Sequence, residues 1–275
     1  MSIWLSGFTK INGTKDGWGF RVPGPYRFVL HTTETDGLGL MPTNHPSPPH
    51  LWVDINRDIY LQGISLDLAG YALRHPAGTI ETNGIPCVQI EIVGRAKDIH
   101  NYSNAWYTKL AQKVIGPVCD AIAIDYHNHL EFKGEGEGIL ASINSKVRMT
   151  ENEWRHFEGV CGHQHVPHNS HWDPGKLNYA KIISILDGNE IQAPDPEPTF
   201  LPILSLGSQG DSVFSWQNEL KHFAYSIKLD GDFGAKTKAR TMDFQRDRHL
   251  IVDGIVGDQT WLESNKASRE SWQRS

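Results

Sequence analysis

The segment from Gly162 to Gly175 is the part of the sequence whose residue types and spacing most clearly allow chemistry. It holds four of the 14 histidines of the chain, at His163, His165, His168 and His171. Histidine is the commonest metal ligand and a frequent general acid or base near neutral pH. Asp173 follows His163 by ten residues across a predicted loop, so the two side chains could converge on one metal ion.

Amide hydrolysis is one reaction that such a segment could serve. It needs a nucleophilic water, a group that takes its proton, and donors or positive charge for the oxyanion. A catalytic zinc ion activates the water and polarises the carbonyl, and it uses three protein ligands and one open position. A surface cluster or a tag-like tract is the alternative interpretation. The varied composition and the turn sequence Asp173-Pro174-Gly175 argue against it.

Two predicted strands carry further polar residues. Residues 26–33 are predicted to form a strand in which His31 faces away from Leu30. Residues 87–93 are strongly apolar and are predicted to lie centrally in a sheet, with Glu91 facing away from Ile90 and Ile92. A carboxylate on such a strand is costly unless it is paired, linked to a metal or functional. Glu91 is therefore a candidate catalytic residue, and a structural ion pair is the alternative.

Over residues 25–188 these features resemble the zinc amidases related to peptidoglycan-recognition proteins and to the T7-type phage lysozyme. In that family a strand ends in a zinc-binding histidine, a Gly-His pair supplies the second ligand, and the Asp of an Asp-Pro-Gly turn is the third. The resemblance implies that Zn²⁺ is held by His31, His163 and Asp173. It also implies that Glu91, in Asn83…Val-Gln-Ile-Glu, is the general base and that His171 stabilises the oxyanion.

Some positions depart from the family or leave its pattern open. His165 and His168 are rivals of His163 for the second ligand. His75 and Asn83 are expected to contact substrate, although His75 could equally be an ordinary loop residue. Pro49 stands where some members have an active-site Tyr, so no tyrosine is given a role.

The remaining patterns predict an α/β (α+β) amidase domain with a central mixed sheet flanked by helices. Further strands are expected at 50–55 and 58–62, and extended structure at 160–166. Helices are expected at 105–123 and 176–186, together with a short helix that a Thr150–Glu153 capping box opens and that continues to Phe157.

After residue 186 the composition changes. Residues 187–203 hold four prolines and several acids, as in a linker. Beyond them the turn Asp230-Gly-x-x-Gly-x-x-Thr recurs 23 residues later from Asp253. Residues 201–265 resemble the small three-helix peptidoglycan-binding domain of wall hydrolases. The predicted organisation is a catalytic domain at 1–186, a linker at 187–203, a peptidoglycan-binding domain at 204–265 and a tail at 266–275.

Charge and composition limit the partners. The net charge of −6 gives no reason to expect nucleic acid or stable membrane association, and a monomer is expected. Residues 201–275 hold ten basic and ten acidic residues, so this part should bind through a shaped pocket. The three cysteines do not suggest a disulfide framework. With no signal sequence evident, we expect synthesis in a host cytoplasm and action on the cell wall after release; a secreted bacterial autolysin is the alternative.

The sequence therefore predicts hydrolysis of the amide bond between N-acetylmuramic acid and L-alanine in peptidoglycan, as in a phage endolysin. A peptidoglycan-binding protein that has lost catalysis and a zinc peptidase that cuts the stem peptide are the alternatives.

Overall fold

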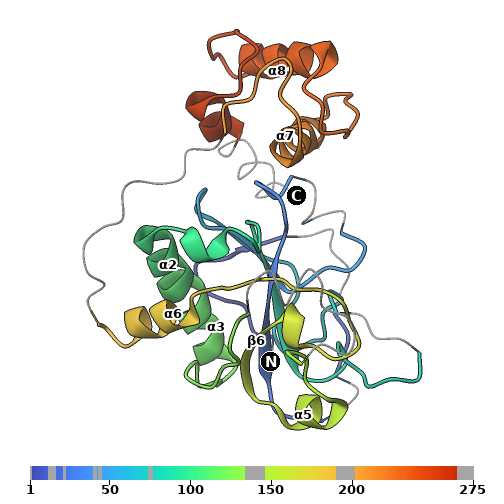
Figure 1. Ribbon diagram of the computed structural model, residues 1–275, viewed down its shortest axis with the longest axis vertical. Coiled ribbons are helices and arrows are strands. Elements are labelled where there is room, and N and C mark those ends of the chain that lie inside the picture. The colour runs from blue at the N-terminus through green and yellow to red at the C-terminus, as the bar shows by residue number, and fades with distance from the viewer. Residues whose placement is uncertain are drawn as a thin grey trace.

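The computed structural model describes residues 2–11, 17–20, 23–39, 42, 45–73, 77–133, 146–189 and 202–264. Figure 1 shows a larger unit built on a sheet and, above it, a smaller helical unit near the C-terminus. Among the described residues, no helix combines the length and the apolar character needed to cross a membrane.

A six-stranded sheet forms the centre of the larger unit, in the order β1-β4-β3-β5-β2-β6. β5 is parallel to both of its neighbours, whereas β3 and β4 are antiparallel, so the sheet is mixed as predicted. The predicted central place of the apolar strand is confirmed. The strands are β1 (Thr9–Lys10), β2 (Arg27–Thr32), β3 (Leu51–Asp54), β4 (Ile59–Gln62), β5 (Cys87–Ile92) and β6 (Gly159–Gly162).

Helices cover one face of this sheet. Phe28 and Leu30 of β2 pack against them, together with Ile90 of β5. The helical layer consists of η1 (Ile99–Asn101), α2 (Asn104–Leu110), η2 (Ala111–Ile115), α3 (Gly116–Ala121) and α6 (Tyr179–Leu186). The single helix expected at 105–123 is present as one run, but its middle part, η2, is π-helical.

The opposite face holds a smaller apolar cluster around Val29, Cys161 and Trp154. Trp154 belongs to α5 (Glu151–His156), whose predicted capping box is confirmed: Thr150 Oγ1 accepts from the Glu153 N–H, and Glu153 accepts from the Thr150 N–H. Because residues alternate along a strand, His31 and Glu91 emerge on this face, away from the helices.

Two predicted boundaries are wrong. The extended segment expected at 160–166 ends at Gly162 and turns into the 3₁₀ helix η3 (His163–His165), since His165 Nδ1 accepts a hydrogen bond from the Gly162 N–H. The last helix of this unit starts at Tyr179 and not at residue 176, because the Asn178 side chain caps it by accepting from the Lys181 N–H.

The C-terminal unit contains α7 (Asp211–His222), α8 (Ala235–Asp247) and a helical segment at 258–264. Trp216, Phe244 and Trp261 lie in its core. The Gln217 and Gln245 side chains each bind one of the two repeated turns through backbone and side-chain hydrogen bonds. Residues 190–201, most of the predicted linker, lie outside the described residues.

Candidate metal and hydrolytic site

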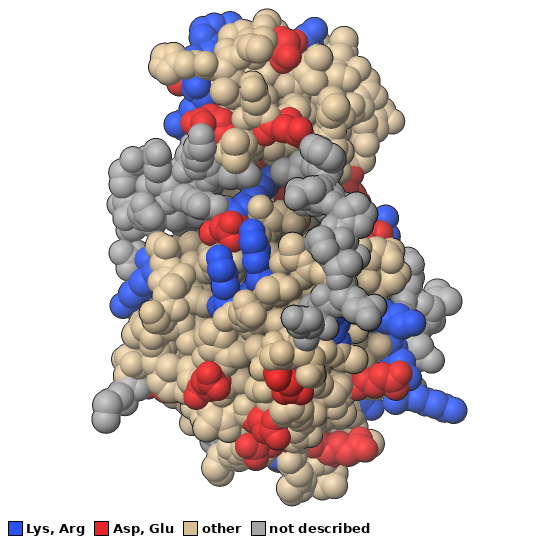
Figure 2. All heavy atoms as spheres, turned by 90° about the vertical axis from the view of Figure 1, so that its left-hand side faces the viewer, with Lys and Arg blue, Asp and Glu red and all other residues tan. Residues whose placement is uncertain are grey.

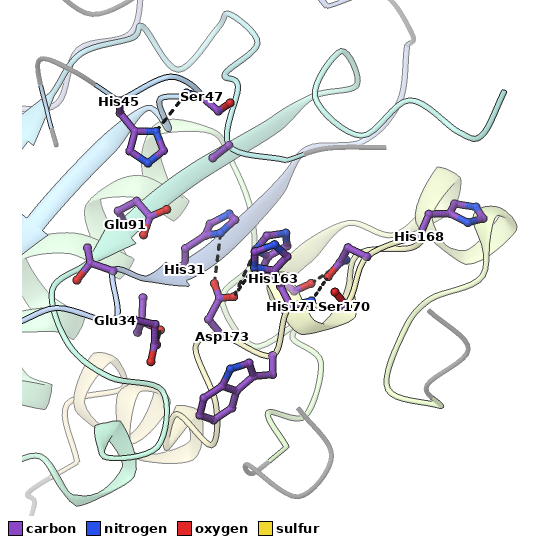
Figure 3. A pocket seen from close by; sticks show the side chains of 15 residues that line it. His31, Glu34, His45, Ser47, Glu91, His163, His168, Ser170, His171 and Asp173 are labelled. Atoms are coloured by element: carbon purple, nitrogen blue, oxygen red, sulfur yellow. Dashed lines mark hydrogen bonds and ion pairs between the residues drawn. The ribbon is translucent and has the colours of Figure 1, made fainter. Parts of the chain in front are cut away.

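A pocket of about 710 Å³ opens at the carboxyl ends of β2 and β5, on the face opposite the helical layer. His31 and Glu91 lie opposite each other in the register of these two strands. The segment after η3 supplies the other side of the pocket, so elements distant in the sequence converge there (Figure 3).

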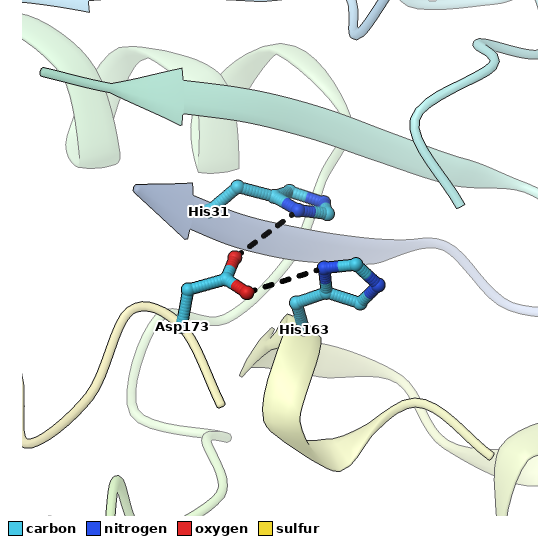
Figure 4. A group of neighbouring side chains, drawn as sticks. All are labelled: His31, His163 and Asp173. Carbon is cyan, nitrogen blue, oxygen red and sulfur yellow. Dashed lines mark ion pairs between the residues drawn. The ribbon is translucent and has the colours of Figure 1, made fainter. Parts of the chain in front are cut away.

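His31, His163 and Asp173 meet at one end of this pocket. Their ligand atoms all lie within 4.8 Å of one another, and all three side chains are buried. His31 Nδ1 is 3.4 Å from Asp173 Oδ2, and His163 Nδ1 is 3.4 Å from Asp173 Oδ1 (Figure 4). These three residues therefore form a group that could hold a metal ion.

The spacing and the chemistry of this group fit zinc. With bonds of about 2.0–2.2 Å and tetrahedral angles, two zinc ligands lie about 3.4 Å apart. His31 Nδ1 and His163 Nδ1 each lie 3.4 Å from one of the two Asp173 carboxylate oxygens. Burial lowers the pKa of His163 to about 4, so its imidazole is neutral at neutral pH. Although burial alone would raise the pKa of Asp173, interactions with His163, His171 and His31 hold it well below its usual range. Neutral imidazole and ionised carboxylate are the forms that bind metal.

The loop between His163 and Asp173 is fixed by Gln164, which is almost fully buried. Its Nε2 donates to the carbonyl oxygens of Trp172 and Gly175, and its backbone N–H donates to the carbonyl oxygen of Asp173. Gly175 has φ +67°, and a Cβ there would lie 2.1 Å from the Ala96 carbonyl oxygen. The turn thus requires glycine, and it holds the Asp173 carboxylate against the two histidines.

Glu91 lies in the same pocket without an opposing charge. Burial raises its pKa well above the usual range, and the negative charges of Asp173 and Glu34 add to the effect. No cation among the described residues offsets them, so the alternative of a structural ion pair finds no partner there. A carboxyl group whose pKa is raised in this way holds a proton more readily than an ordinary Glu, which suits a general acid–base role.

His171 lies at the mouth of the pocket. Its ring stacks on that of His163 with the centroids 4.1 Å apart, and its Nδ1 is 3.5 Å from Asp173 Oδ1. The side chain is 62% exposed, so it can reach a bound substrate. This position is consistent with the predicted contact with an oxyanion.

The two rivals for the second ligand are used elsewhere. His165 Nδ1 accepts from the Gly162 N–H, and its Nε2 contacts the Glu131 carbonyl oxygen at 2.8 Å, so both ring nitrogens are occupied by backbone. His168 Nε2 pairs with Glu151 Oε1 at 2.7 Å, at the far end of the pocket (Figure 3).

Of the two predicted substrate contacts, the structure describes only Asn83. The Asn83 side chain is buried and bonds to the Leu73 backbone and to Gln89 Nε2, and Asn83 does not line the pocket. His75 lies outside the described residues.

Three residues near the site were missed by the sequence reasoning. Glu34 and His45 line the pocket, and Gln164 holds its loop. Glu34 Oε1 accepts from Thr32 Oγ1 and from the Ala96 N–H. Its place three residues after His31 was the available signal. His45 precedes β3 in a proline-rich segment whose path no local pattern predicts.

One comparison with known proteins concerns the C-terminal unit. Residues 209–262 match the family model described as "Putative peptidoglycan binding domain", inside the predicted range of 204–265. A curated relative from Kitasatospora aureofaciens, "Uncharacterized protein in bpoA1 3'region", is 41% identical over 71 residues, which are 25% of this chain and 60% of the relative. The matched segment thus spans less than two thirds of that relative.

Two solved structures are similar to shares of the chain that differ in size. The SleB N-terminal domain is 34% identical over 24% of this chain and 93% of its own, with a TM-score of 0.24. The solution structure of Citrobacter freundii AmpD is 14% identical over 69% of this chain and 96% of its own, with a TM-score of 0.37. The match of residues 209–262 to the peptidoglycan-binding family model indicates a peptidoglycan-related protein.

Proposed function

We propose that this protein is an N-acetylmuramoyl-L-alanine amidase that depends on zinc and acts on peptidoglycan. The observation that carries the proposal is the meeting of His31, His163 and Asp173 beside Glu91 in one pocket. The match of residues 209–262 to a peptidoglycan-binding family supports the choice of substrate. The bond to be cut joins the lactyl carbonyl of muramic acid to the nitrogen of L-alanine.

Each residue has a defined part in the proposed reaction. His31, His163 and Asp173 would hold the zinc ion, which supplies a Lewis acid and an activated water when bound. Glu91 accepts the proton of the attacking water at a carboxylate oxygen and returns it to the leaving nitrogen. His171 donates a hydrogen bond to the oxyanion from the mouth of the pocket.

Peptidoglycan is the proposed partner, and the chain is proposed to act as a monomer in the wall, in the manner of a phage lytic enzyme. Figure 2 shows basic and acidic side chains interspersed on the face it presents, with no continuous basic surface among the described residues there. Such a surface offers no strong attraction for nucleic acid on that face.

Mass spectrometry of digested sacculi tests the proposal. Glycan strands free of peptide, together with intact stem peptides that begin at L-alanine, are the expected products. Cut stem peptides would instead indicate a zinc peptidase, and the absence of any product would indicate a binding protein. Either of those two results would refute amidase activity.

A further inference from the structure

The C-terminal unit touches the larger unit through one side of α7. Ser215 and Glu219 are four residues apart and therefore share a helix face. Ser215 Oγ accepts a hydrogen bond from the Asp36 N–H at 3.1 Å, and Glu219 Oε1 accepts one from the Gly39 N–H at 3.2 Å. Figure 1 shows α7 as the labelled helix of this unit that lies nearest the sheet.

A buried charge pair strengthens this contact. Arg57, in the turn between β3 and β4, places Nη1 3.3 Å from Glu219 Oε1, and the two side chains are 3% and 2% exposed. The Arg57 guanidinium also lies over the Trp261 ring, 5.2 Å from its centroid. Arg57 also pairs with the buried Asp54, whose Oδ2 lies 3.4 Å from Arg57 Nε, so the guanidinium lies between one carboxylate of the larger unit and one of α7.

The docked segment, residues 34–39, directly follows the strand that carries His31. Its first residue, Glu34, lines the pocket. Arg95 links this wall to α7, because its Nη1 donates to the Glu34 carbonyl oxygen at 2.7 Å and pairs with Asp211 Oδ2 at 3.0 Å. Its Nη2 pairs with Asp36 Oδ1 at 3.1 Å.

Side chains of the larger unit and of α7 closely cover the two glycines of this segment. A Cβ on Gly37 would lie 2.2 Å from Arg57 Nη1, and a Cβ on Gly39 would lie 2.0 Å from Asn218 Nδ2. Leu38, between these glycines, is buried with Trp52 in a separate apolar cluster. Residues 34–39 are therefore held between α7 on one side and the sheet on the other.

We propose that α7 and Arg95 position the wall of the hydrolytic pocket, so that the C-terminal unit is part of the catalytic apparatus as well as a wall anchor. This inference rests on the proposed amidase function. A tethered anchor would raise activity only on polymeric peptidoglycan, through effective concentration. Docking of the kind found here makes hydrolysis of a small soluble muropeptide depend on α7 as well.

Hydrogen–deuterium exchange of the full chain tests the docking without any measurement of activity. Glu219→Ala removes the acceptor of the Gly39 N–H, and Ser215→Ala removes that of the Asp36 N–H. We expect exchange in a peptide covering residues 34–39 to become at least ~10-fold faster in Glu219→Ala. Asp243→Ala is the matched control, because among the described residues Asp243 forms ion pairs with Arg240 and Arg246, inside α8. Unchanged protection in Glu219→Ala would overturn the docking.

Steady-state kinetics on a soluble muropeptide test the positioning. We expect Glu219→Ala to lower kcat by ~10-fold or more, since small displacements of a catalytic wall are costly, and zinc content to stay the same. Asp211→Ala, at a residue with a 79% exposed side chain, removes the Arg95 contact without a buried charge and should lower kcat in the same direction. Arg95→Lys should recover part of the rate that Arg95→Ala loses.

The two proposals fail in different ways. Faster exchange at residues 34–39 with an unchanged kcat would overturn the positioning role and leave the amidase function intact. A wild-type chain that releases no product would refute the proposed function, and the positioning role with it, whereas the exchange experiment would still decide whether the units dock.

Discussion

Substitution of Glu91 by Gln separates acid–base chemistry from the shape of the pocket. Of the three carboxylates that line the pocket, Asp173 faces His31 and His163, and Glu34 Oε1 accepts two hydrogen bonds. Burial raises the pKa of Glu34 as well, but that of Glu91 is raised well above its usual range, and among the described residues no hydrogen-bond donor engages the Glu91 carboxylate. Glu91→Gln keeps the size of the side chain and removes the proton carrier.

Loss of a general acid–base group costs ~10²- to 10⁴-fold in rate, or about 2.7–5.4 kcal/mol of transition-state stabilisation. We expect kcat on muropeptide to fall by that factor in Glu91→Gln, with zinc content unchanged. Glu34→Gln is the matched control: its amide oxygen can still accept from Thr32 Oγ1 and the Ala96 N–H, so its loss should stay below ~10-fold.

The same variant has a pH signature in the metal-free protein. The raised pKa of Glu91 means that the folded state holds this proton more tightly than the unfolded state. The contribution of Glu91 to the free energy of unfolding is therefore largest below the ordinary Glu pKa, and it is lost as the pH rises through the pKa of the folded state. Glu91→Gln should be more stable than the wild type at pH 7, and the difference should shrink toward pH 4.

Near-normal kcat in Glu91→Gln, or an equal loss in Glu34→Gln, would refute the assignment of Glu91 as the acid–base group.

Three further predictions concern neighbouring residues. His171→Ala should lower kcat by ~10²-fold or more with zinc retained, and His171→Lys should recover part of the rate; activity equal to wild type in His171→Ala would contradict its role. Gly175→Ala should destabilise the protein by at least ~1–2 kcal/mol, since φ is +67°, as measured by urea unfolding. Burial lowers the pKa of His50 to about 4. Below pH ~6.5 the unfolded state therefore binds a proton at this group that the folded state does not, and the free energy of unfolding should fall by about 2 kcal/mol by pH 5. His50→Gln should flatten the pH profile of the free energy of unfolding in this range. An unchanged slope would contradict the role given to His50.

Strand periodicity and short motifs made much of the fold predictable. Alternation alone placed His31 and Glu91 on the face opposite Leu30 and Ile90, and the structure has them there. The capping box at Thr150 was also predictable, because it joins two residues that are close in the sequence. Boundaries failed where a side chain competes for the backbone, as at Gly162 with His165 and at Asn178.

Long-range contacts were not predictable from local patterns. The docking of α7 joins Arg57 to Glu219, which are 162 positions apart, and neither residue belongs to a motif. The proline-rich composition of residues 187–203 predicted a linker between two units but not that the described residues on either side of it are in contact. The bond from Gln89 to Asn83 likewise depends on a turn that only the folded chain forms.

The zinc content of purified full-length variants tests the central claim most directly, because it asks whether these three residues hold the ion. Elemental analysis should find one zinc per chain in the wild type and in His165→Ala, whose ring nitrogens contact only backbone. His163→Ala should lose most of the metal, since a site of three protein ligands is left with two. Full zinc content in His163→Ala would contradict the assignment of His31, His163 and Asp173 as the metal site.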